Sequence, residues 1–247
     1  MTIERAADLL SAAHSAVAFT GAGASAESGI PTFRGAGGLW TKYDPVKVSS
    51  IDSFMQDPTP YWMVSRERGG IALAARPNRG HLALAALEAA GFLVAIVTQN
   101  TDGLHQASGS RRVVEVHGSS RTVQCLDCGM RESRAVIQAR LAVQMPPLCK
   151  SCGGMFLKPT VVLFGEPMPA AAMHEALSLA QSADVMLVVG SSLVVRPAAD
   201  VPLAAVRCGA TLIIINAEPT PFDSLAEVVI HGRAGEVLPE ILKLLDE

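Results

Sequence analysis

Short apolar segments alternate with helix-like stretches along most of this 247-residue chain. Six segments are rich in β-branched residues, and they cover residues 16–20, 93–98, 113–116, 185–190, 212–216 and 228–230. Helical spacing and helix-forming composition mark residues 3–14, 80–90, 170–181, 198–208 and 236–245. Uninterrupted apolar runs are typical of parallel strands that are covered on both faces. The alternation therefore predicts an α/β fold with a doubly wound parallel sheet.

Two regions interrupt this alternation. Residues 29–76 contain both tryptophans and both tyrosines but no strong strand pattern, so we predict a long loop with small helices there. Residues 121–158 carry four of the five cysteines, and we predict that they form an inserted module. The main sheet domain would then comprise residues 1–28, 77–120 and 159–247.

The inserted module contains two Cys-x-x-Cys pairs with 20 residues between them: Cys125 with Cys128, and Cys149 with Cys152. This spacing is at the upper edge of what is expected for a four-thiolate zinc site, and a glycine follows each pair. Four sulfur ligands close a tetrahedral shell, so the expected zinc ion is structural rather than catalytic. A redox dithiol pair and ordinary core cysteines are the alternatives. We expect the fifth cysteine, Cys208, to be a small buried core residue.

A glycine-rich turn, GAGASA at residues 21–26, follows the first predicted strand. Such a turn lets the backbone approach a pyrophosphate, although a glycine-rich turn without a ligand is an equal alternative on this pattern alone. No strand ending in Asp or Glu follows about 20 residues later, which disfavours a hydride-transferring dehydrogenase. Polar residues end two later strands, GSS at 190–192 and NAE at 216–218. Because ligands bind at the carboxyl ends of such strands, the combination predicts a dinucleotide site.

Two more strand ends carry groups suited to chemistry. TQNTD at residues 98–102 supplies an amide and a carboxylate, and His117 comes just after an apolar strand. Histidine titrates near neutral pH and is a natural general base, while a histidine bonded to the backbone at a strand end is the alternative. Neither a Gly-x-Ser-x-Gly turn nor a His-Glu-x-x-His sequence occurs, so a serine triad or a catalytic zinc has no support.

Charge and hydropathy disfavour several other classes. Twenty Lys and Arg against 23 Asp and Glu give a net charge of -3, so we expect no intrinsic binding of nucleic acid or anionic lipid. The apolar runs are far shorter than the roughly 20 residues of a membrane helix. The first residues lack the basic and apolar regions of a secretory signal. We therefore expect a cytoplasmic protein that does not span a membrane.

These motifs together resemble those of the sirtuins, the NAD-dependent protein lysine deacylases. The shared sequences are GAGASAESGIPTFR (21–34), TQNTDGLH (98–105), VHG (116–118), the two Cys-x-x-Cys pairs, VLFGE (162–166), GSSL (190–193) and NAE (216–218). The match runs from residue 16 to residue 238 and is typical of a small prokaryotic-type member. It implies a Rossmann-like NAD-binding domain, a cofactor-binding loop with small helices at residues 29–76, and a zinc-binding module at residues 121–158.

The resemblance also implies a reaction and the residues that perform it. NAD is consumed: the acyl group of an acyl-lysine protein or peptide is transferred to ADP-ribose, and nicotinamide is released. His117 would be the general base that activates a ribose hydroxyl, with Asn100 as the second catalytic residue. The implied cofactor-binding residues are Gly21, Ala22, Gly23, Ser25, Glu27, Thr32, Phe33, Arg34, Trp40, Gln99, Asn100, Asp102, Gly190, Ser191, Ser192, Asn216, Ala217, Glu218 and Ala234. The implied substrate residues are Ser65, Arg68, Val162, Phe164, Gly165, Glu166, Leu193 and Val195.

One departure from the family pattern bears on the acyl group. Members that remove succinyl or malonyl groups carry a Tyr-x-x-Arg sequence after the cofactor loop. Here Ser65 replaces the tyrosine while Arg68 is kept, so we predict that uncharged acyl groups are preferred. A protein mono-ADP-ribosyltransferase and a non-catalytic, NAD-sensing zinc-ribbon binder are the alternative functions.

Overall fold

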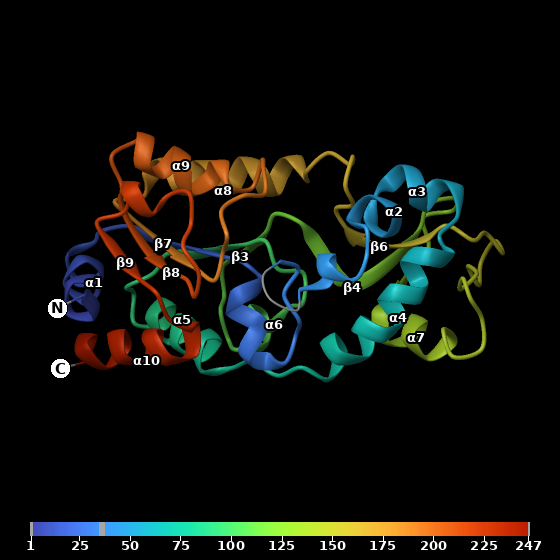
Figure 1. The fold of residues 1–247 in the computed structure, drawn as a ribbon, viewed down its shortest axis with the longest axis horizontal. Coiled ribbons are helices and arrows are strands. Elements are labelled where there is room, and N and C mark those ends of the chain that lie inside the picture. Colours follow the sequence, from blue (N-terminus) through green and yellow to red (C-terminus); the bar gives the residue numbers. More distant parts are fainter. Residues whose placement is uncertain (1, 35–37, 247) are drawn as a thin grey trace.

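Two β-sheets lie toward opposite ends of the molecule in the computed structural model, which describes residues 2–34 and 38–246 (Figure 1). The larger sheet has six strands in the order β3-β2-β1-β7-β8-β9, and every neighbouring pair is parallel. Its strands are β1 (Ala16–Thr20), β2 (Ala95–Thr98), β3 (Val113–Glu115), β7 (Val185–Val189), β8 (Thr211–Ile215) and β9 (Val228–Ile230). The six apolar segments in the sequence therefore correctly predicted these strands.

Helices cover both faces of the larger sheet (Figure 1). One face packs against α1 (Thr2–Ala12), α5 (Arg79–Ala89) and α10 (Ala234–Leu245), and the other against α8 (Ala170–Ser182) and α9 (Asp200–Arg207). Successive side chains of a strand point to opposite faces, and in β1 Val17 and Phe19 join one apolar core while Ala18 joins the other. Burial on both faces is why the strands read as continuous apolar runs, and it confirms the predicted doubly wound α/β class.

The smaller sheet is antiparallel and has the strand order β5-β4-β6. It comprises β4 (Gly118–Cys125), β5 (Arg131–Ser133) and β6 (Leu157–Val161), with α7 (Arg134–Arg140) beside it. A third apolar core joins Val123 and Leu157 of this sheet to Phe54 and Trp62. The indole Nε1 of Trp62 donates to the Leu157 carbonyl at 3.0 Å. The segment around residues 51–62 is thus anchored on the small sheet rather than on the large one.

Residues 29–34 and 38–76 contain helices and no strand within their described part, as the sequence predicted. The helices are a 3-10 turn η2 (Leu39–Thr41), α2 (Pro45–Ser49), α3 (Ile51–Gln56) and α4 (Thr59–Ala74). The remaining short elements are η1 (Ala22–Ser28), α6 (Leu104–Ala107) and η3 (Asp223–Leu225). The 16-residue helix α4 exceeds the small helices expected here. Within the described residues, no helix is long and apolar enough to cross a membrane.

The expectation for Cys208 is wrong, because this cysteine is exposed. It follows the last residue of α9, and its N–H donates back to the carbonyl of Ala204 at 3.1 Å. Gly209 then takes a positive φ of 96° and turns the chain into β8. Cys208 therefore lies at a helix terminus at the surface, although the helix before it is apolar on its inner face.

Candidate active site

A crevice lies where β1 and β7 are neighbours, because the chain continues from β1 to one side of the sheet and from β7 to the other. The turns that follow the two strands touch each other: Gly23 N–H donates to the Gly190 carbonyl at 2.8 Å. A Cβ on Gly23 would lie 2.8 Å from Gly190 Cα, and a Cβ on Gly190 would lie 2.2 Å from Ala24 N. Both positions require glycine, and Gly190 also has a positive φ of 62°.

A cavity of about 830 Å³ opens at this crevice. Its lining includes His117 and every residue that the resemblance implies in cofactor binding, from Gly21 to Ala234. It also includes the implied substrate residues Ser65, Arg68, Val162, Phe164, Gly165, Glu166 and Val195. Leu193 is the exception among the described residues: its side chain is buried in the core that α8 and α9 cover. Residues far apart in the sequence are thus gathered around one cavity.

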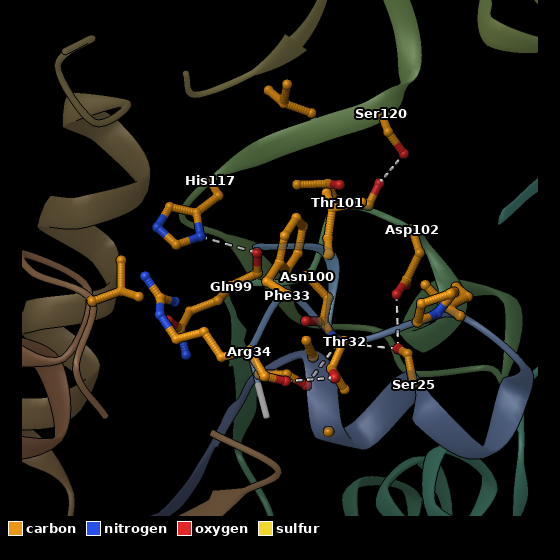
Figure 2. Close-up of a pocket in the computed structure, with 18 of the residues that line it drawn as sticks. Ser25, Thr32, Phe33, Arg34, Gln99, Asn100, Thr101, Asp102, His117 and Ser120 are labelled. Atoms are coloured by element: carbon orange, nitrogen blue, oxygen red, sulfur yellow. Dashed lines mark hydrogen bonds between the residues drawn. The ribbon is translucent and has the colours of Figure 1, made fainter. Parts of the chain in front are cut away.

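The imidazole of His117 is held by the backbone of the neighbouring strand end. Its Nδ1 lies 3.0 Å from the Gln99 carbonyl oxygen (Figure 2). Because a carbonyl only accepts, Nδ1 carries the proton in the neutral ring and Nε2 keeps a lone pair. Burial lowers the pKa of His117, and the hydrogen bond to Gln99 partly opposes this. The ring is therefore an unprotonated base near neutral pH. It is also bonded to the backbone at a strand end, which was the alternative to a general base in the sequence analysis.

A chain of polar side chains forms another wall of the cavity (Figure 2). Ser25 Oγ donates to an oxygen of Asp102 at 2.7 Å, and Asn100 Nδ2 donates to Ser25 Oγ at 3.1 Å. Asn100 Nδ2 also donates to the Gly21 carbonyl at 3.0 Å. These bonds fix the amide of Asn100 between the glycine-rich turn and Asp102.

Two buried histidines that the sequence analysis did not single out, His81 and His105, adjoin this chain of side chains. His81 Nε2 lies 3.4 Å from Ser25 Oγ. The ring centroids of His81 and His105 are 4.9 Å apart. His105 Nε2 lies 2.8 Å from Thr20 Oγ1, while burial and the neighbouring His81 lower the pKa of His105 to about 3. Burial also lowers the pKa of His81. The only sequence indication was the place of His105 three residues after Asp102 in the TQNTDGLH segment.

At the other end of the cavity, Asn216 and Glu218 follow β8 as the sequence predicted. Asn216 Nδ2 donates to the Glu218 carbonyl at 2.6 Å, which holds this turn. The carboxylate of Glu27 accepts the Gly235 N–H at 2.7 Å and so caps the amino terminus of α10. Gln99 Nε2 donates to Ser191 Oγ at 2.8 Å across the strand ends.

Aromatic side chains connect the segment around Phe33 and Trp40 to the segment 162–166. The ring centroids of Phe33 and Trp40 are 5.4 Å apart, and those of Trp40 and Phe164 are 6.1 Å apart. The guanidinium of Arg68 lies 4.6 Å from the centroid of Phe33 and donates to the Pro31 carbonyl at 3.2 Å. Arg68 of α4 is thereby held against the segment that carries Pro31 and Phe33.

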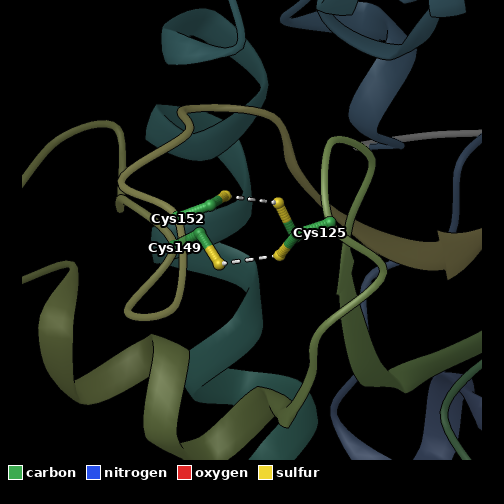
Figure 3. A group of neighbouring side chains, drawn as sticks. Cys125, Cys149 and Cys152 are labelled. Atoms are coloured by element: carbon green, nitrogen blue, oxygen red, sulfur yellow. Dashed lines mark hydrogen bonds between the residues drawn. The ribbon is translucent and has the colours of Figure 1, made fainter.

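The four paired cysteines form a single cluster at the end of β4, the central strand of the small sheet (Figure 3). Their sulfur atoms lie within 4.8 Å of one another, and the Sγ atoms of Cys125 and Cys152 and those of Cys128 and Cys149 are 3.6 Å apart. Zinc–sulfur bonds of ~2.3 Å in a tetrahedron place sulfurs ~3.8 Å apart, so the donor set fits one zinc ion. The four thiols fill its shell, which makes the site structural.

Sequence and structure comparisons agree with this geometry. A sequence model of the Sir2 family matches residues 21–197. NAD-dependent protein deacylase 2 of Archaeoglobus fulgidus is 49% identical over 241 residues, which cover 98% of this chain and 95% of that protein. The NAD-dependent protein deacetylase of Caldivirga maquilingensis is 47% identical and covers 96% of this chain with 91% of its own length.

Solved Sir2 structures superpose over nearly all of the chain. A Sir2 enzyme structure with 48% identity has a TM-score of 0.93 and covers 99% of this chain and 98% of its own. A Sir2 structure with a deacetylated p53 peptide and 3′-O-acetyl ADP-ribose has a TM-score of 0.95, 38% identity and 98% coverage of both chains. Since the family sequence model matches most of the chain and these relatives match nearly all of it, the chain belongs to the Sir2 family.

Proposed function

We propose that this chain is an NAD-dependent protein lysine deacylase that transfers the acyl group from lysine to ADP-ribose and releases nicotinamide. The observation that carries the proposal is the single cavity that joins the lone pair of His117 to the polar chain of Ser25, Asn100 and Asp102. The named relatives are NAD-dependent deacylases and deacetylases, and one Sir2 neighbour contains a peptide with NAD.

NAD fits the cavity as a co-substrate. The glycine turns at the junction of β1 and β7 bring backbone close to the cavity, as a pyrophosphate requires. Asn216 and Glu218 lie at the carboxyl end of β8, where they reach ribose hydroxyls. When bound, NAD supplies the ribose carbon that accepts the acyl oxygen as nicotinamide leaves.

The protein's own residues then have three tasks. Asn100, Ser25 and Asp102 orient the nicotinamide end through a chain of hydrogen bonds that is already formed. His117 Nε2 accepts the proton of a ribose hydroxyl, while the Gln99 carbonyl stabilises the proton on Nδ1. Phe33, on the cofactor loop, excludes water from the reacting ribose.

The acyl-lysine enters between two segments of the cavity wall. Val162, Phe164 and Gly165 form one side, and Val195 forms the other. Backbone on both sides lets a peptide add as an extended strand, which makes recognition depend little on the peptide's side chains. Sir2 neighbours contain a propionylated peptide and a myristoylated histone peptide, so this cavity is proposed to accept acyl chains of more than one length.

We expect uncharged acyl groups to react faster than succinyl groups. Arg68 is stacked on Phe33 and bonded to the Pro31 carbonyl, and Ser65 accepts hydrogen bonds from Arg134 at 2.8 and 3.1 Å through its carbonyl and hydroxyl oxygens. The Ser65 oxygens are therefore already used and do not replace the missing phenol, although Arg68 keeps an Nε without a hydrogen-bond partner. Initial rates with acetyl-lysine and succinyl-lysine versions of one peptide test this, and faster succinyl removal would overturn it.

The remaining parts of the proposal concern organisation and location. The division is residues 1–28, 77–120 and 159–247 as the NAD-binding domain, residues 29–76 as the cofactor loop and helices, and residues 121–158 as the zinc-binding module. The four clustered thiols are suited to a reducing compartment, which supports a cytoplasmic location.

Mass spectrometry after incubation with NAD and an acetyl-lysine peptide tests the activity. The proposal predicts a peptide that has lost its acetyl group and a protein of unchanged mass. A product that carries added ADP-ribose, with the acetyl group retained, would instead support a mono-ADP-ribosyltransferase. No NAD consumption with any acyl peptide would support a binding protein.

A further inference from the structure

The segment 162–166, which forms one side of the acyl-lysine site, is tied to its surroundings by backbone hydrogen bonds. Val162 N–H donates to the His117 carbonyl at 2.9 Å. Phe164 forms two hydrogen bonds with the junction of α2 and α3: its N–H donates to the Ser49 carbonyl, and its carbonyl accepts from Ile51 N–H, both at 2.9 Å. The position of this segment therefore sets both the acyl-lysine wall and the backbone of the proposed base.

A part-buried ion pair closes the same segment. Lys158 Nζ, on β6, lies 2.9 Å from Glu166 Oε2, and the Lys158 side chain is only 9% exposed. The same ammonium donates to the Val161 carbonyl at 2.7 Å and to the Pro159 carbonyl at 3.3 Å. The ammonium of Lys158 thus bonds two carbonyls of β6, just before the segment, and the carboxylate of Glu166 at the end of the segment.

Glu166 completes the closure from the other side. The oxygen that faces Lys158 also accepts the Leu163 N–H at 2.8 Å, and the Glu166 N–H donates to the Leu163 carbonyl at 3.0 Å. Gly165 takes a positive φ of 88° between them. The carboxylate of Glu166 is therefore bonded inside the segment, although the sequence placed this residue among those that contact substrate.

We propose that Lys158 and Glu166 are a positioning pair that holds segment 162–166 in the shape that binds acyl-lysine. The inference rests on the proposed deacylase function. Removing one partner leaves the other charge without its bonding partner in a site where the Lys158 side chain is only 9% exposed and the Glu166 side chain 21% exposed, so we expect the segment to rearrange. The Leu163 N–H loses its acceptor in the same event when Glu166 is shortened. The NAD side of the cavity depends on other residues and should not change.

The test uses Lys158→Met, Glu166→Gln and the double variant, with Glu175→Gln as the matched control. Glu175 forms an exposed ion pair with Arg112 at 3.1 Å on α8, outside the cavity lining. Each single variant is expected to raise KM for an acetyl-lysine peptide by about tenfold, which corresponds to about 1.4 kcal/mol. We expect little change in NAD affinity and a smaller change in kcat than in KM, because the segment also bonds the His117 carbonyl through Val162 N–H. The double variant should lose less than the sum of the single losses, because the two residues act on each other.

Hydrogen exchange provides a readout that does not depend on turnover. The amides of residues 162–166 should exchange faster in each single variant and stay unchanged in the control. If the wild-type protein releases no nicotinamide with any acyl-lysine peptide, the proposed function fails, and the exchange measurement still decides whether the pair holds the segment. Unchanged exchange in segment 162–166 would overturn the proposal. An active single variant with an unchanged KM for the peptide would also overturn it. The same holds if peptide binding, NAD affinity and thermal stability are all weakened to the same extent.

Discussion

The imidazole of His117 shows how one backbone contact prepares a side chain for catalysis. The Gln99 carbonyl fixes the proton on Nδ1, so the lone pair of Nε2 does not depend on solvent for its orientation. Burial lowers the pKa of the ring, which keeps it unprotonated at neutral pH. The sequence placed a histidine after a strand, but only the structure shows which nitrogen is available.

We predict that the acidic limb of kcat/KM for wild-type enzyme lies below pH 6.5, the ordinary pKa of histidine. Activity should fall as the pH falls through the pKa of His117, since the protonated ring cannot accept a proton. His117→Ala should reduce turnover by about 10²–10⁴-fold while NAD affinity and folding stay close to wild type. If His117→Ala kept the wild-type kcat/KM and its fall at acidic pH, another group would be the base.

The buried His105 makes a separate prediction about stability. Its pKa is about 3 in the folded protein and ordinarily 6.5, so the unfolded chain binds more protons between these values. The protonation of His105 therefore does not reduce the free energy of unfolding well above pH 6.5, and it reduces that free energy progressively as the pH falls below 6.5. At pH 5.5 this one residue should lower the free energy of unfolding by about 1.4 kcal/mol relative to pH 7.5.

Urea unfolding of the wild type and of His105→Gln at both pH values measures this effect. The difference in free energy of unfolding between the wild type and the variant should decrease by about 1.4 kcal/mol from pH 7.5 to pH 5.5. His81 titrates in both proteins and cancels in the comparison. An advantage that is constant or grows between pH 7.5 and pH 5.5 would mean that His105 is not buried in its neutral form.

At the scale of elements, the strands that the sequence predicted best are those buried on both faces. β7 and β8 lie in the middle of the sheet, and their apolar runs are continuous. β4, β5 and β6 were missed because the strands of the antiparallel sheet are not continuous apolar runs. In β4 only Val123 and Cys125 are buried, and β5 has the sequence Arg-Glu-Ser. Polar strands of this kind are specified by their partners and by the cysteine cluster, which a local pattern does not contain.

The zinc site is predicted to support the small sheet and, through it, the acyl-lysine wall. Cys125 and Cys149 belong to the same apolar core as Trp62, and β6 leads directly into segment 162–166. Zinc binding of this type contributes on the order of 10 kcal/mol to folding, so removing the ion should loosen this core. We expect one zinc per chain, a lower melting temperature after chelation, and a larger loss of peptide binding than of NAD binding.

Atomic emission, thermal unfolding and ligand titrations of the chelated protein check these three expectations. Cys149→Ser, which removes one ligand, should reproduce the effect, while Cys208→Ser, at an exposed helix end, should not. Metal-free protein with an unchanged melting temperature would contradict the structural role.

At the scale of the whole molecule, the active-site cavity is the place where segments from both sheets meet. Motifs near residues 21, 99, 117, 164, 190 and 216 were each ambiguous alone, and the structure places all of them around one cavity. The sequence predicted these residues because each follows a recognisable strand or motif. It did not predict His81, His105 or the bonding of Lys158 to Glu166, since their environments come from contacts between distant segments or from the local shape of a loop.

In the proposed function, nicotinamide release is coupled to transfer of the acyl group from lysine to ADP-ribose. The most direct measurement is the stoichiometry of the products when purified wild-type protein acts on NAD and an acetyl-lysine peptide. We expect one nicotinamide, one free-lysine peptide and one O-acetyl-ADP-ribose per turnover, with no reaction when the lysine is unacetylated. Nicotinamide released without an acetylated ADP-ribose product, or a deacetylated peptide formed without NAD, would contradict it.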